Sequence, residues 1–358
     1  MTKAYVGLGS NIGDRAGYIS QAVRLLTQTD GICVVQTSRI IETASLDHSS
    51  QTNYLNSVAY IETALPPQQL LRRLVQIENS LGRLRTQKWA ERTIDLDLLV
   101  FGDEIINSED LTVPHPQMHL RYFVLKGLDE LAAGMIHPVL HQPIGELLHR
   151  LNGCSYAIRP DQPRLISIGG LIGVGKTTLA RALAEKLSCM LLLEAYDTNP
   201  YLADVYNGKS ELALESQLYF LNSRAEQLSA SMIGPGRAAV SDYVFEKELI
   251  YADKMLDTSQ RKQYNKQHEH IAADIVSPVL AIYLEDAEEN CLERIHRRNR
   301  SYEQKIDLEF LHQIRCAYED LFAGWTLCPL IRLRAVRFDS TSDKEVERLA
   351  NEVKYYTA

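Results

Sequence analysis

Residues 166–187 read ISIGGLIGVGKTTLARALAEKL and contain the spacing Gly170-x-x-x-x-Gly175-Lys176-Thr177. The apolar residues before the motif predict a strand, and the pattern after it predicts an amphipathic helix. The glycines let successive backbone N–H groups turn inward around phosphate oxygens, and the helix start adds the positive end of its dipole. Lys176 can then reach the outer phosphates, and the Thr177 hydroxyl can bind Mg²⁺. The segment therefore predicts an ATP or GTP site. Its expected contacts are Gly170, Gly173, Gly175, Lys176, Thr177 and Thr178.

The surrounding pattern divides the chain of 358 residues into two domains. After residue 164, strands predicted at 165–168, 238–241 and 279–284 alternate with long helical stretches, which is typical of a parallel α/β sheet. Before residue 152, short strands and helices mix in an order that favours an α+β domain with a largely antiparallel sheet. Gly153, Pro160 and Pro163 punctuate the stretch between them. We therefore predict domains at 1–152 and 164–358, joined by a linker at 153–163.

Composition narrows the class of protein. With 45% hydrophobic and 23% charged residues, both halves can bury a core. The net charge of −8 argues against broad binding of nucleic acid or anionic membranes. We find no apolar run long enough to cross a membrane and no signal-peptide pattern at the N-terminus. The six cysteines show no C-x-x-C or framework spacing, so we expect reduced thiols and a cytoplasmic protein.

Four ordered segments after the phosphate-binding loop carry a resemblance to a known family. They read LLLEAYDTNPYL at 191–202, QLYFLNSR at 217–224, VSDYVFEK at 240–247 and ERIHRRNRSYEQKIDLEFL at 293–311. This half resembles the deoxyribonucleoside kinases, particularly their bacterial purine-preferring members. The resemblance implies a P-loop kinase fold, ATP with Mg²⁺, and a deoxyribonucleoside substrate. Deoxyadenosine or deoxyguanosine is the preferred substrate, and deoxycytidine stays possible because Gln and Arg can serve either ring type.

The resemblance also implies roles for single residues. Glu194 looks like the general base for the nucleoside 5′-hydroxyl, a suitable task for a carboxylate after a strand beside the loop. Gln217 and Arg224, seven apart and hence on one helix face, look like base readers. Three further positions match the family: Asp242 as the acidic partner near Arg224, Tyr206 and Glu303 as holders of the sugar 3′-hydroxyl, and Arg237 as an arginine near the transferred phosphate.

The basic run of Arg294, Arg297, Arg298 and Arg300 resembles the lid that folds over the phosphates. Arg294 and Arg298 are spaced i,i+4 and share a helix face, so together they can clamp developing charge. Arg300 is an expected ATP contact. One departure stands out, since the family often carries Glu-Arg-Ser where this chain has Gly236-Arg237-Ala238. A carboxylate expected to help hold Mg²⁺ is then missing there.

In the first half, residues 92–101 read RTIDLDLLVF. The period of two puts Asp95 and Asp97 on one strand face, with Ile94, Leu96, Leu98 and Val100 on the other. Two neighbouring carboxylates repel unless a cation lies between them, and Mg²⁺ prefers carboxylate oxygen. The basic loop upstream, with Arg83, Arg85, Lys88 and Arg92, suits a polyphosphate. A general-acid pair or an exposed polar face are the alternatives.

Four segments of this half read YVGLGSNIGDR at 5–15, NYLNSVAYIET at 53–63, RTIDLDLLVFG at 92–102 and LTVPHPQMHLRYFVL at 111–125. With them, this half resembles 6-hydroxymethyl-7,8-dihydropterin pyrophosphokinase, a folate-pathway family with a ferredoxin-like fold. The family transfers the β,γ-pyrophosphoryl group of ATP to the pterin hydroxymethyl and releases AMP. The resemblance implies Mg²⁺ ligands at Asp95 and Asp97, phosphate contacts at Arg83 and Arg92, ATP contacts at His115 and Arg121, pterin stacking on Tyr54 and Phe123, and pterin-edge reading by Asn56. Ala90-Glu91 stands where the family commonly has Gly-Pro.

The sequence therefore predicts an α+β ferredoxin-like domain followed by an α/β P-loop kinase domain, together forming a bifunctional ATP-dependent enzyme. Two alternatives remain. One domain could be a degenerate binding or dimerising module, or the second could be a nucleotide (monophosphate) kinase. Related deoxynucleoside kinases are often dimers, so we also expect a homodimer through the second domain.

Overall fold

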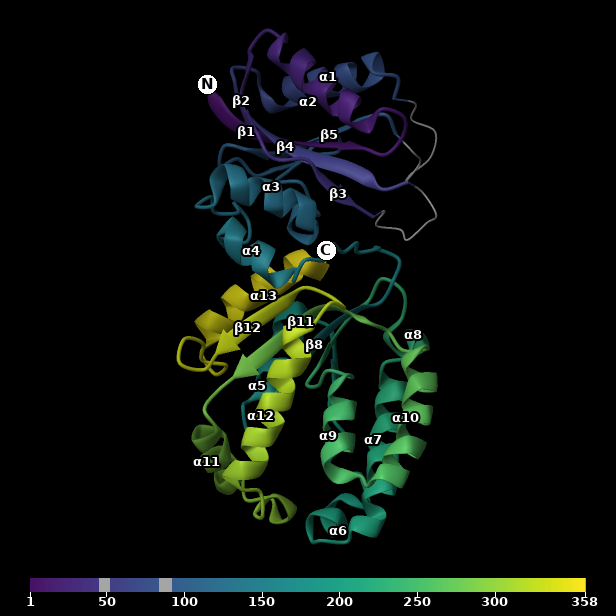
Figure 1. Cartoon of the computed structure of the whole chain (residues 1–358). Coiled ribbons are helices and arrows are strands. Elements are labelled where there is room, and N and C mark those ends of the chain that lie inside the picture. The colour runs from purple at the N-terminus through teal and green to yellow at the C-terminus, as the bar shows by residue number, and fades with distance from the viewer. Residues whose placement is uncertain (45–51, 84–91, 358) are drawn as a thin grey trace. The chain divides into compact units, whose positions relative to one another are not determined.

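The computed structural model describes residues 1–44, 52–83 and 92–357 (Figure 1). They form two compact units, Met1–Ala157 and Ile158–Ala358, and the division falls inside the stretch predicted as the linker. Among the described residues, no helix is both long and apolar enough to span a membrane.

The N-terminal unit is built on an antiparallel sheet of order β2-β4-β1-β5, with β3 also paired to β4. This confirms the predicted α+β class. Its elements are β1 (Thr2–Ser10), α1 (Arg15–Thr27), β2 (Ile32–Thr37), β3 (Ile41–Thr43), β4 (Tyr54–Thr63), α2 (Pro67–Ser80), β5 (Asp95–Phe101), β6 (Ile106–Asn107), β7 (Thr112–Val113), α3 (Tyr122–Ala132) and α4 (Ile144–Arg150).

Different helices cover the two faces of this sheet, α1 and α2 on one face and α3 on the other. Leu70, Leu74 and Ile77 of α2 join the apolar side of α1 in one core against the sheet, and Figure 1 shows the two helices together. On the other face α3 packs on β4, where a Cβ at Gly127 would lie 2.6 Å from a methyl carbon of Val58. This close approach requires glycine and seats α3 against the strand face that carries Tyr54 and Asn56.

A β-bulge corrects one detail of the predicted strand pattern. Val6 pairs with Leu98 while its neighbour Tyr5 pairs with Val100, so Leu99 is an extra residue on β5. The alternation reverses there, and Phe101 joins the core of Leu96 and Leu98 in place of Val100. The expectation that Val100 shares their face was therefore wrong.

The C-terminal unit is a five-stranded parallel sheet of order β12-β11-β8-β10-β9 with helices around it, which confirms the predicted α/β class. The strands β9 and β12, of three and five residues, were not predicted. The elements are β8 (Arg164–Gly170), α5 (Lys176–Leu187), β9 (Met190–Leu192), α6 (Leu202–Tyr206), α7 (Ala213–Gln227), α8 (Ala230–Ile233), β10 (Ala238–Ser241), α9 (Lys247–Met255), α10 (Thr258–Ala272), β11 (Pro278–Glu285), α11 (Glu288–Arg298), α12 (Leu308–Ala323), β12 (Leu330–Arg334) and α13 (Asp343–Thr357).

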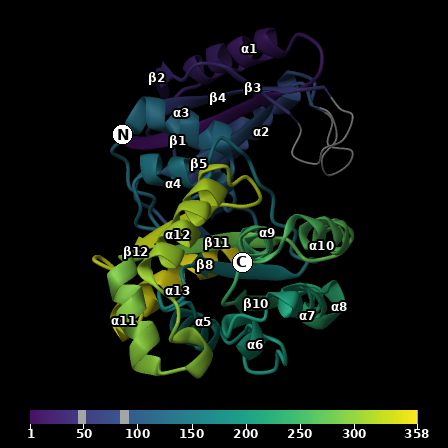
Figure 2. The same cartoon turned by 60° about the horizontal axis from the view of Figure 1, so that its bottom comes forward.

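The strand order fixes where a ligand can bind in this unit. Strands β10 and β9 lie on one side of β8, and β11 and β12 lie on the other side, so the direction in which strands are added reverses at β8. In open parallel sheets such a reversal leaves a crevice at the carboxyl ends of the strands. Figures 1 and 2 show α7, α9 and α10 as neighbours on one side of the unit.

Buried His137, near α4, makes the stability of the N-terminal unit depend on pH. Burial, with a smaller contribution from His141, lowers the pKa of His137 to about 4. Its Nδ1 accepts backbone N–H groups of Val139 at 3.2 Å and Leu140 at 3.1 Å, which a protonated Nδ1 could not do. Between the ordinary pKa and the lowered one, the unfolded state binds more protons, so stability falls as pH falls from about 6.5 to about 4.

We predict that His137→Asn, which keeps an acceptor, removes up to roughly 3 kcal/mol of this acid-induced loss. Hydrogen–deuterium exchange of β4 peptides, corrected for intrinsic rates, reports the unfolding free energy of this unit between pH 7 and pH 4.5. His149→Asn, at an exposed position of α4, is the matched control. An unchanged pH slope in His137→Asn would contradict the assignment.

Candidate active sites

In the N-terminal unit, β5 presents Asp95 and Asp97 on the face opposite to the core. Their side chains are 20% and 36% exposed. Their partners on β1 are Gly9 and Gly7, so no cross-strand side chain covers the carboxylates. A Cβ at Gly9 would lie 3.1 Å from the Asn56 side-chain oxygen, and one at Gly7 would lie 3.4 Å from the Leu99 side chain, so the glycines let these two side chains lie close to β1.

Three arginines surround these carboxylates. Arg83 and Arg92 each lie 2.5 Å from a different oxygen of Asp95. Arg121 lies 3.4 Å from Asp97. The structure thus brings together five side chains predicted for ATP and metal binding. The other basic residues of the predicted loop, Arg85 and Lys88, lie outside the described residues, as does the departure at Ala90-Glu91.

Glu78 completes this cluster and was missed in the sequence. It is 1% exposed, its Oε1 accepts the Leu96 backbone N–H at 2.8 Å, and it forms an ion pair with Arg83. It therefore fixes β5 between the two aspartates and holds an arginine beside them. The available signal was an acidic residue four positions after Leu74, on the apolar face of a helix.

His115 and Arg121 lie next to each other at the same site. The His115 backbone N–H donates to the carbonyl of the bulged Leu99 at 2.9 Å, so the bulge sets its position. Burial, together with the positive charge of Arg121, lowers the pKa of His115 to about 3. The imidazole is therefore neutral at physiological pH and can bind a ligand only through hydrogen bonds and packing.

The three residues predicted to hold the pterin belong to β4 and α3. Tyr54 and Asn56 alternate onto the strand face that α3 covers. Phe123 lies one helical turn before Gly127, the contact point of α3 with β4. Asn56 pairs with Gly9 and donates to the Thr43 hydroxyl at 2.9 Å. All three residues thus lie on the same face of the sheet as Asp95 and Asp97.

In the C-terminal unit, the predicted loop joins β8 to α5. Gly173 has a φ of +81°, and a Cβ there would lie 2.4 Å from the Cys291 carbonyl oxygen, so only glycine fits. Lys176 Nζ donates to the Gly170 and Leu171 carbonyls at 2.8 Å each. The loop therefore folds around the lysine that is to meet the phosphates.

Asp242 follows β10 and joins this loop to the next one. It accepts the Thr177 hydroxyl at 2.5 Å and the Glu194 backbone N–H at 2.9 Å. Burial raises the pKa of its carboxyl, and the charge of Glu194 raises it further. The expectation that Asp242 is the acidic partner of Arg224 was wrong, because the acids paired with Arg224 are Glu194 and Glu248.

Arg237 is not part of this site. It is exposed at the residue before β10, and its carbonyl accepts the Arg164 N–H at the start of β8. Parallel strands place this edge of the sheet opposite to the loop at 170–177. The expected place of Arg237 beside the transferred phosphate was therefore wrong, and the missing carboxylate at Gly236 is irrelevant to the metal. Asp242, beside Thr177, is an acidic group that does lie at the carboxyl edge.

Glu194 lies at the centre of a buried charge network. Its side chain is 1% exposed and meets Arg224, Lys247 and the Tyr196 hydroxyl. Burial alone would raise the pKa of the Glu194 carboxyl, but the charges of Lys247 and Arg224 hold it well below its ordinary value. Glu194 is therefore an anion at any physiological pH. Lys247 and Glu248 were not predicted as site residues. Lys247 is the last residue of the segment VSDYVFEK, and Glu248 is the residue after it.

Three of the four expected lid arginines, Arg294, Arg298 and Arg300, make ion pairs with the protein. Arg294 lies 2.5 Å from Asp286 and donates to the Gly173 carbonyl at 3.3 Å. Arg298 forms two hydrogen bonds of 2.5 and 2.6 Å with Glu303. Arg300 lies 3.6 Å from Glu303 and stacks over Tyr196, with its guanidinium carbon 5.7 Å from the ring centre. The lid is thus connected to both Glu194 and the predicted sugar site.

The remaining predicted substrate contacts lie close to these groups. Gln217 is buried on α7 and lies 3.3 Å from Met255 Sδ. Tyr206 lies against Tyr302, with ring centres 6.0 Å apart. Burial, and then the charge of Glu303, raises the pKa of Tyr206. The carboxylate of Glu303 therefore lies near the hydroxyl of Tyr206, as a shared sugar site requires.

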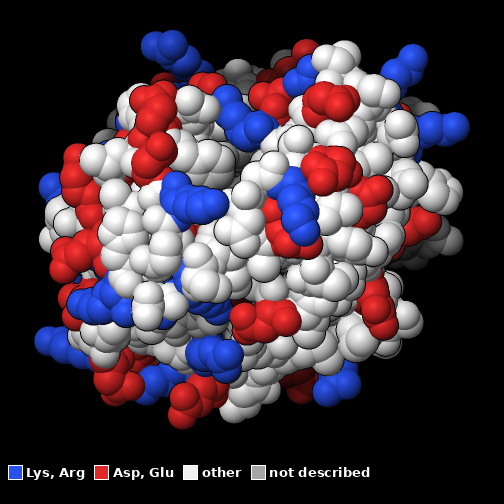
Figure 3. Space-filling model, turned by 90° about the horizontal axis from the view of Figure 1, so that it is seen from below, with Lys and Arg blue, Asp and Glu red and all other residues white. Residues whose placement is uncertain are grey.

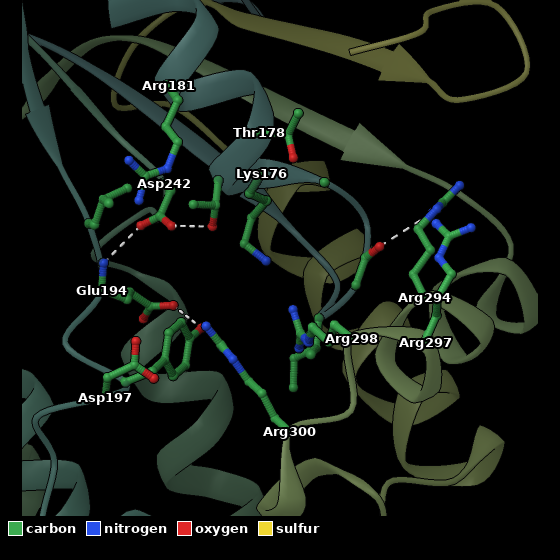
Figure 4. Close-up of a pocket in the computed structure, with 16 residues that line it drawn as sticks. Lys176, Thr178, Arg181, Glu194, Asp197, Asp242, Arg294, Arg297, Arg298 and Arg300 are labelled. Atoms are coloured by element: carbon green, nitrogen blue, oxygen red, sulfur yellow. Dashed lines mark hydrogen bonds between the residues drawn. The ribbon is translucent and has the colours of Figure 1, made fainter. Parts of the chain in front are cut away.

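The phosphate-loop residues, Glu194 and the lid arginines line a cavity of about 530 Å³, shown in Figure 4. The predicted base and sugar contacts are not among its lining residues, which leaves out Tyr206, Gln217, Arg224 and Glu303. Lys176, Asp242 and Glu194 lie on one side of it, and Arg294, Arg297 and Arg298 on the other. Arg181 and Asp197 also line it and had not been singled out. The full lining is Ile172, Gly173, Gly175, Lys176, Thr177, Thr178, Arg181, Leu193, Glu194, Tyr196, Asp197, Asp242, Arg294, Arg297, Arg298 and Arg300.

The donor groups of both sites suit Mg²⁺. In the part of the chain that the structure describes, no three His, Cys, Asp or Glu side chains gather as a metal cage. Mg²⁺ rarely needs one, since it keeps water and binds through one or two carboxylates together with substrate phosphates. Asp95 with Asp97, and Thr177 beside Asp242, offer oxygen donors of this kind.

Comparison with known proteins agrees with this geometry. Residues 5–133 match the family 7,8-dihydro-6-hydroxymethylpterin-pyrophosphokinase (HPPK), and residues 166–357 match the family Deoxynucleoside kinase. The first half is 48% identical to the 2-amino-4-hydroxy-6-hydroxymethyldihydropteridine pyrophosphokinase of Bacillus subtilis over 128 residues, 36% of this chain and 77% of that protein. It is 42% identical to the enzyme of the same name from Haemophilus influenzae over 138 residues, 38% of this chain and 86% of that protein.

Among solved structures, a deoxyadenosine kinase from M. mycoides is similar to this chain. The similarity covers 53% of this chain and 98% of that chain, with 22% identity and a TM-score of 0.46. On the family matches and the identities with the two bacterial enzymes, this chain belongs to the HPPK family in its N-terminal unit and to the deoxynucleoside kinase family in its C-terminal unit.

Proposed function

We propose that the chain is a bifunctional enzyme with two independent ATP sites. The N-terminal unit transfers the β,γ-pyrophosphoryl group of ATP to 6-hydroxymethyl-7,8-dihydropterin and releases AMP. The C-terminal unit transfers the γ-phosphoryl group of ATP to the 5′-hydroxyl of a deoxyribonucleoside, preferably a purine one, and releases ADP. The observation that carries this proposal is that each unit gathers both its carboxylates and its phosphate-binding cations at one place.

For the first reaction, the hydroxymethyl oxygen must reach the β-phosphorus of ATP. Tyr54, Asn56 and Phe123 would hold the pterin on the α3 side of the sheet, on the face that also carries Asp95 and Asp97. The arginines beside these aspartates would bind phosphate oxygens through their paired N–H groups. Mg²⁺ would be held by Asp95 and Asp97 and would neutralise charge on the triphosphate.

For the second reaction, the 5′-oxygen must reach the γ-phosphorus in line with the leaving ADP. The loop and Lys176 would hold the phosphates, and Thr177 would bind Mg²⁺. Glu194 would accept the hydrogen bond, and then the proton, of the 5′-hydroxyl. Gln217 and Arg224 would read the base, and Tyr206 and Glu303 would hold the sugar. Arg294, Arg298 and Arg300 would stabilise charge on the transferred group.

Two alternatives are weaker. A degenerate binding module would not need Asp95 with Asp97, or Lys176 with Glu194. A nucleotide (monophosphate) kinase must bind the acceptor's phosphate, whereas the carboxyl groups of Glu194 and Asp197 line the cavity. Figure 3 shows acidic and basic side chains interspersed over the face in view, without a large basic patch there. On the net charge of −8 we propose no nucleic-acid or membrane partner. We also propose a cytoplasmic location.

The proposal is tested by incubating the purified chain with ATP and either hydroxymethyl-dihydropterin or each of the four deoxynucleosides. AMP reports pyrophosphoryl transfer and ADP reports phosphoryl transfer. We expect AMP with the pterin, and ADP with deoxyadenosine or deoxyguanosine above the pyrimidines. If no nucleoside gives ADP, the kinase proposal is wrong, and if the pterin gives no AMP, the pyrophosphokinase proposal is wrong.

We predict that the two activities can be removed separately. Lys176→Ala should abolish nucleoside phosphorylation and leave pterin pyrophosphorylation within about twofold, because the lysine contacts only the second ATP. Asp95→Asn with Asp97→Asn should do the reverse, because the carboxylates hold the metal of the first ATP. The separate AMP and ADP assays measure both effects. Loss of both activities in either folded variant would contradict independent sites.

We predict that Glu78→Gln lowers the kcat/KM of pterin pyrophosphorylation roughly 10-fold, because positioning errors near a reacting centre are costly. The change removes the charge that holds Arg83 while it preserves the size of the side chain. ADP formation from a nucleoside should stay unchanged. Glu104→Gln, at an exposed position, is the matched control. Equal kcat/KM values for Glu78→Gln and Glu104→Gln would remove Glu78 from the site.

We further propose a homodimer through the C-terminal unit. Light scattering of the full chain during size-exclusion chromatography should give about twice the chain mass of 40.5 kDa. A mass equal to one chain at micromolar concentration would contradict this part of the proposal.

A further inference from the structure

Lys247 is a buried cation for which the sequence suggested no role. It is the first residue of α9, it is 3% exposed, and its ammonium is paired with the Glu194 carboxylate. The ammonium lies 5.1 Å from the ring centre of Tyr251 and 5.9 Å from that of Tyr196. Burial lowers the pKa of Lys247, while the charge of Glu194 opposes that change. Such a group is costly to bury, so its place against Glu194 calls for an explanation.

The contacts of Glu194 divide unequally between its two oxygens. Oε1 meets both Arg224 and Lys247, whereas Oε2 accepts only the Tyr196 hydroxyl among the described contacts. An ionised carboxylate offers about four lone-pair directions, two on each oxygen. Oε1 is therefore saturated by two cations, and Oε2 retains capacity for one more donor. Glu194 and Tyr196 both line the cavity, so that donor can come from a bound substrate.

Arg224 cannot hold Glu194 in this orientation alone. Its guanidinium is shared with a second buried carboxylate, Glu248, which also accepts the Tyr264 hydroxyl. Lys247 differs, because its ion pair in the described part of the chain is with Glu194. Because Arg224 shares its positive charge between two carboxylates, Lys247 supplies a second positive charge to Glu194. It does so from α9, whereas Arg224 belongs to α7.

We propose that Lys247 is a positioning residue of the nucleoside kinase site. Its ammonium fixes Oε1 of Glu194 from behind, so that Oε2 faces the accepting 5′-hydroxyl. This inference rests on the proposed phosphorylation of a nucleoside by the C-terminal unit. Because the transition state of phosphoryl transfer is loose, orientation of the hydroxyl matters more than early removal of its proton. A strongly acidic carboxylate held in one orientation suits that task.

A purely structural role predicts different behaviour. If Lys247 only balances charge in the core, its loss should destabilise the C-terminal unit and lower activity regardless of Glu194. If it acts through Glu194, its effect on kcat should disappear once Glu194 can no longer accept the hydroxyl. A double-mutant cycle separates these two cases.

The experiment compares the full chain with Lys247→Met, Glu194→Gln and the double variant, using the deoxynucleoside that the wild type phosphorylates best. We expect Lys247→Met to lower kcat roughly 100-fold, within the range for loss of a positioned acid–base group. The KM for ATP should stay within about twofold of the wild-type value, since Lys247 is not among the residues that line the cavity around the phosphate-binding loop. In the Glu194→Gln background, the same change should lower kcat less than about threefold.

Lys247→Arg, which keeps the charge, should recover kcat to within roughly tenfold of the wild type. Lys254→Met, an exposed lysine of the same helix, is the matched control and should behave as the wild type. Emission of the buried Trp325 reports folding of this unit. If Lys247→Met does not show native emission, Lys247→Gln replaces it in the cycle.

The inference is overturned if Lys247→Met retains kcat within about threefold, if the loss is equal in the Glu194→Gln background, or if the KM for ATP rises in parallel with the loss of kcat. A wild type that phosphorylates no nucleoside would instead overturn the proposed function. The two failures are therefore distinguishable.

Discussion

The Glu194 carboxylate is buried at the base of the C-terminal cavity, and this is possible only because two cations meet it there. Removing an ion from water costs several kcal/mol, and only close opposite charges and hydrogen bonds offset that cost. Arg224 from α7 and Lys247 from α9 supply the charges, and Tyr196 supplies a hydrogen bond. The packing of two helices against the sheet is thus coupled to the orientation of one carboxylate.

Asp242 extends the same constraint to the rest of this site. Its two oxygens accept from the Thr177 hydroxyl and the Glu194 backbone N–H, so one carboxylate links the loops that follow β8, β9 and β10. The lid adds a further link, because Arg300 contacts both Glu303 and the ring of Tyr196. Phosphate site, acceptor site and lid are therefore joined by a continuous set of charged contacts.

The N-terminal unit meets a related problem with different means. Asp95 and Asp97 stay partly exposed, so they avoid most of the desolvation cost, and three arginines reduce their mutual repulsion. Gly9 and Gly7 of β1 pair with the two aspartates, and a bulge in β5 places His115. The two proposed ATP sites of this chain thus differ in construction, one with a phosphate-binding loop and one without. A pterin and a deoxynucleoside are not consecutive intermediates, so the fusion does not by itself imply a substrate channel.

The sequence by itself determined both families and both fold classes, because their motifs depend on local spacing, and it proposed site residues on the same basis. The loop at 170–177 and the alternation around Asp95 bring groups together within one turn or one strand. Only the tertiary structure decided which distant groups meet. Arg237 lies at the edge of the sheet opposite to the phosphate-binding loop. Arg224 pairs with Glu248 and not with Asp242, and a bulge places Val100 on the strand face opposite to the one predicted. The tertiary structure also brought Lys247 to Glu194 and Glu78 to β5. The first contact joins residues 53 positions apart and the second joins residues 18 positions apart. Local periodicity in the sequence does not indicate which helix packs against which strand end.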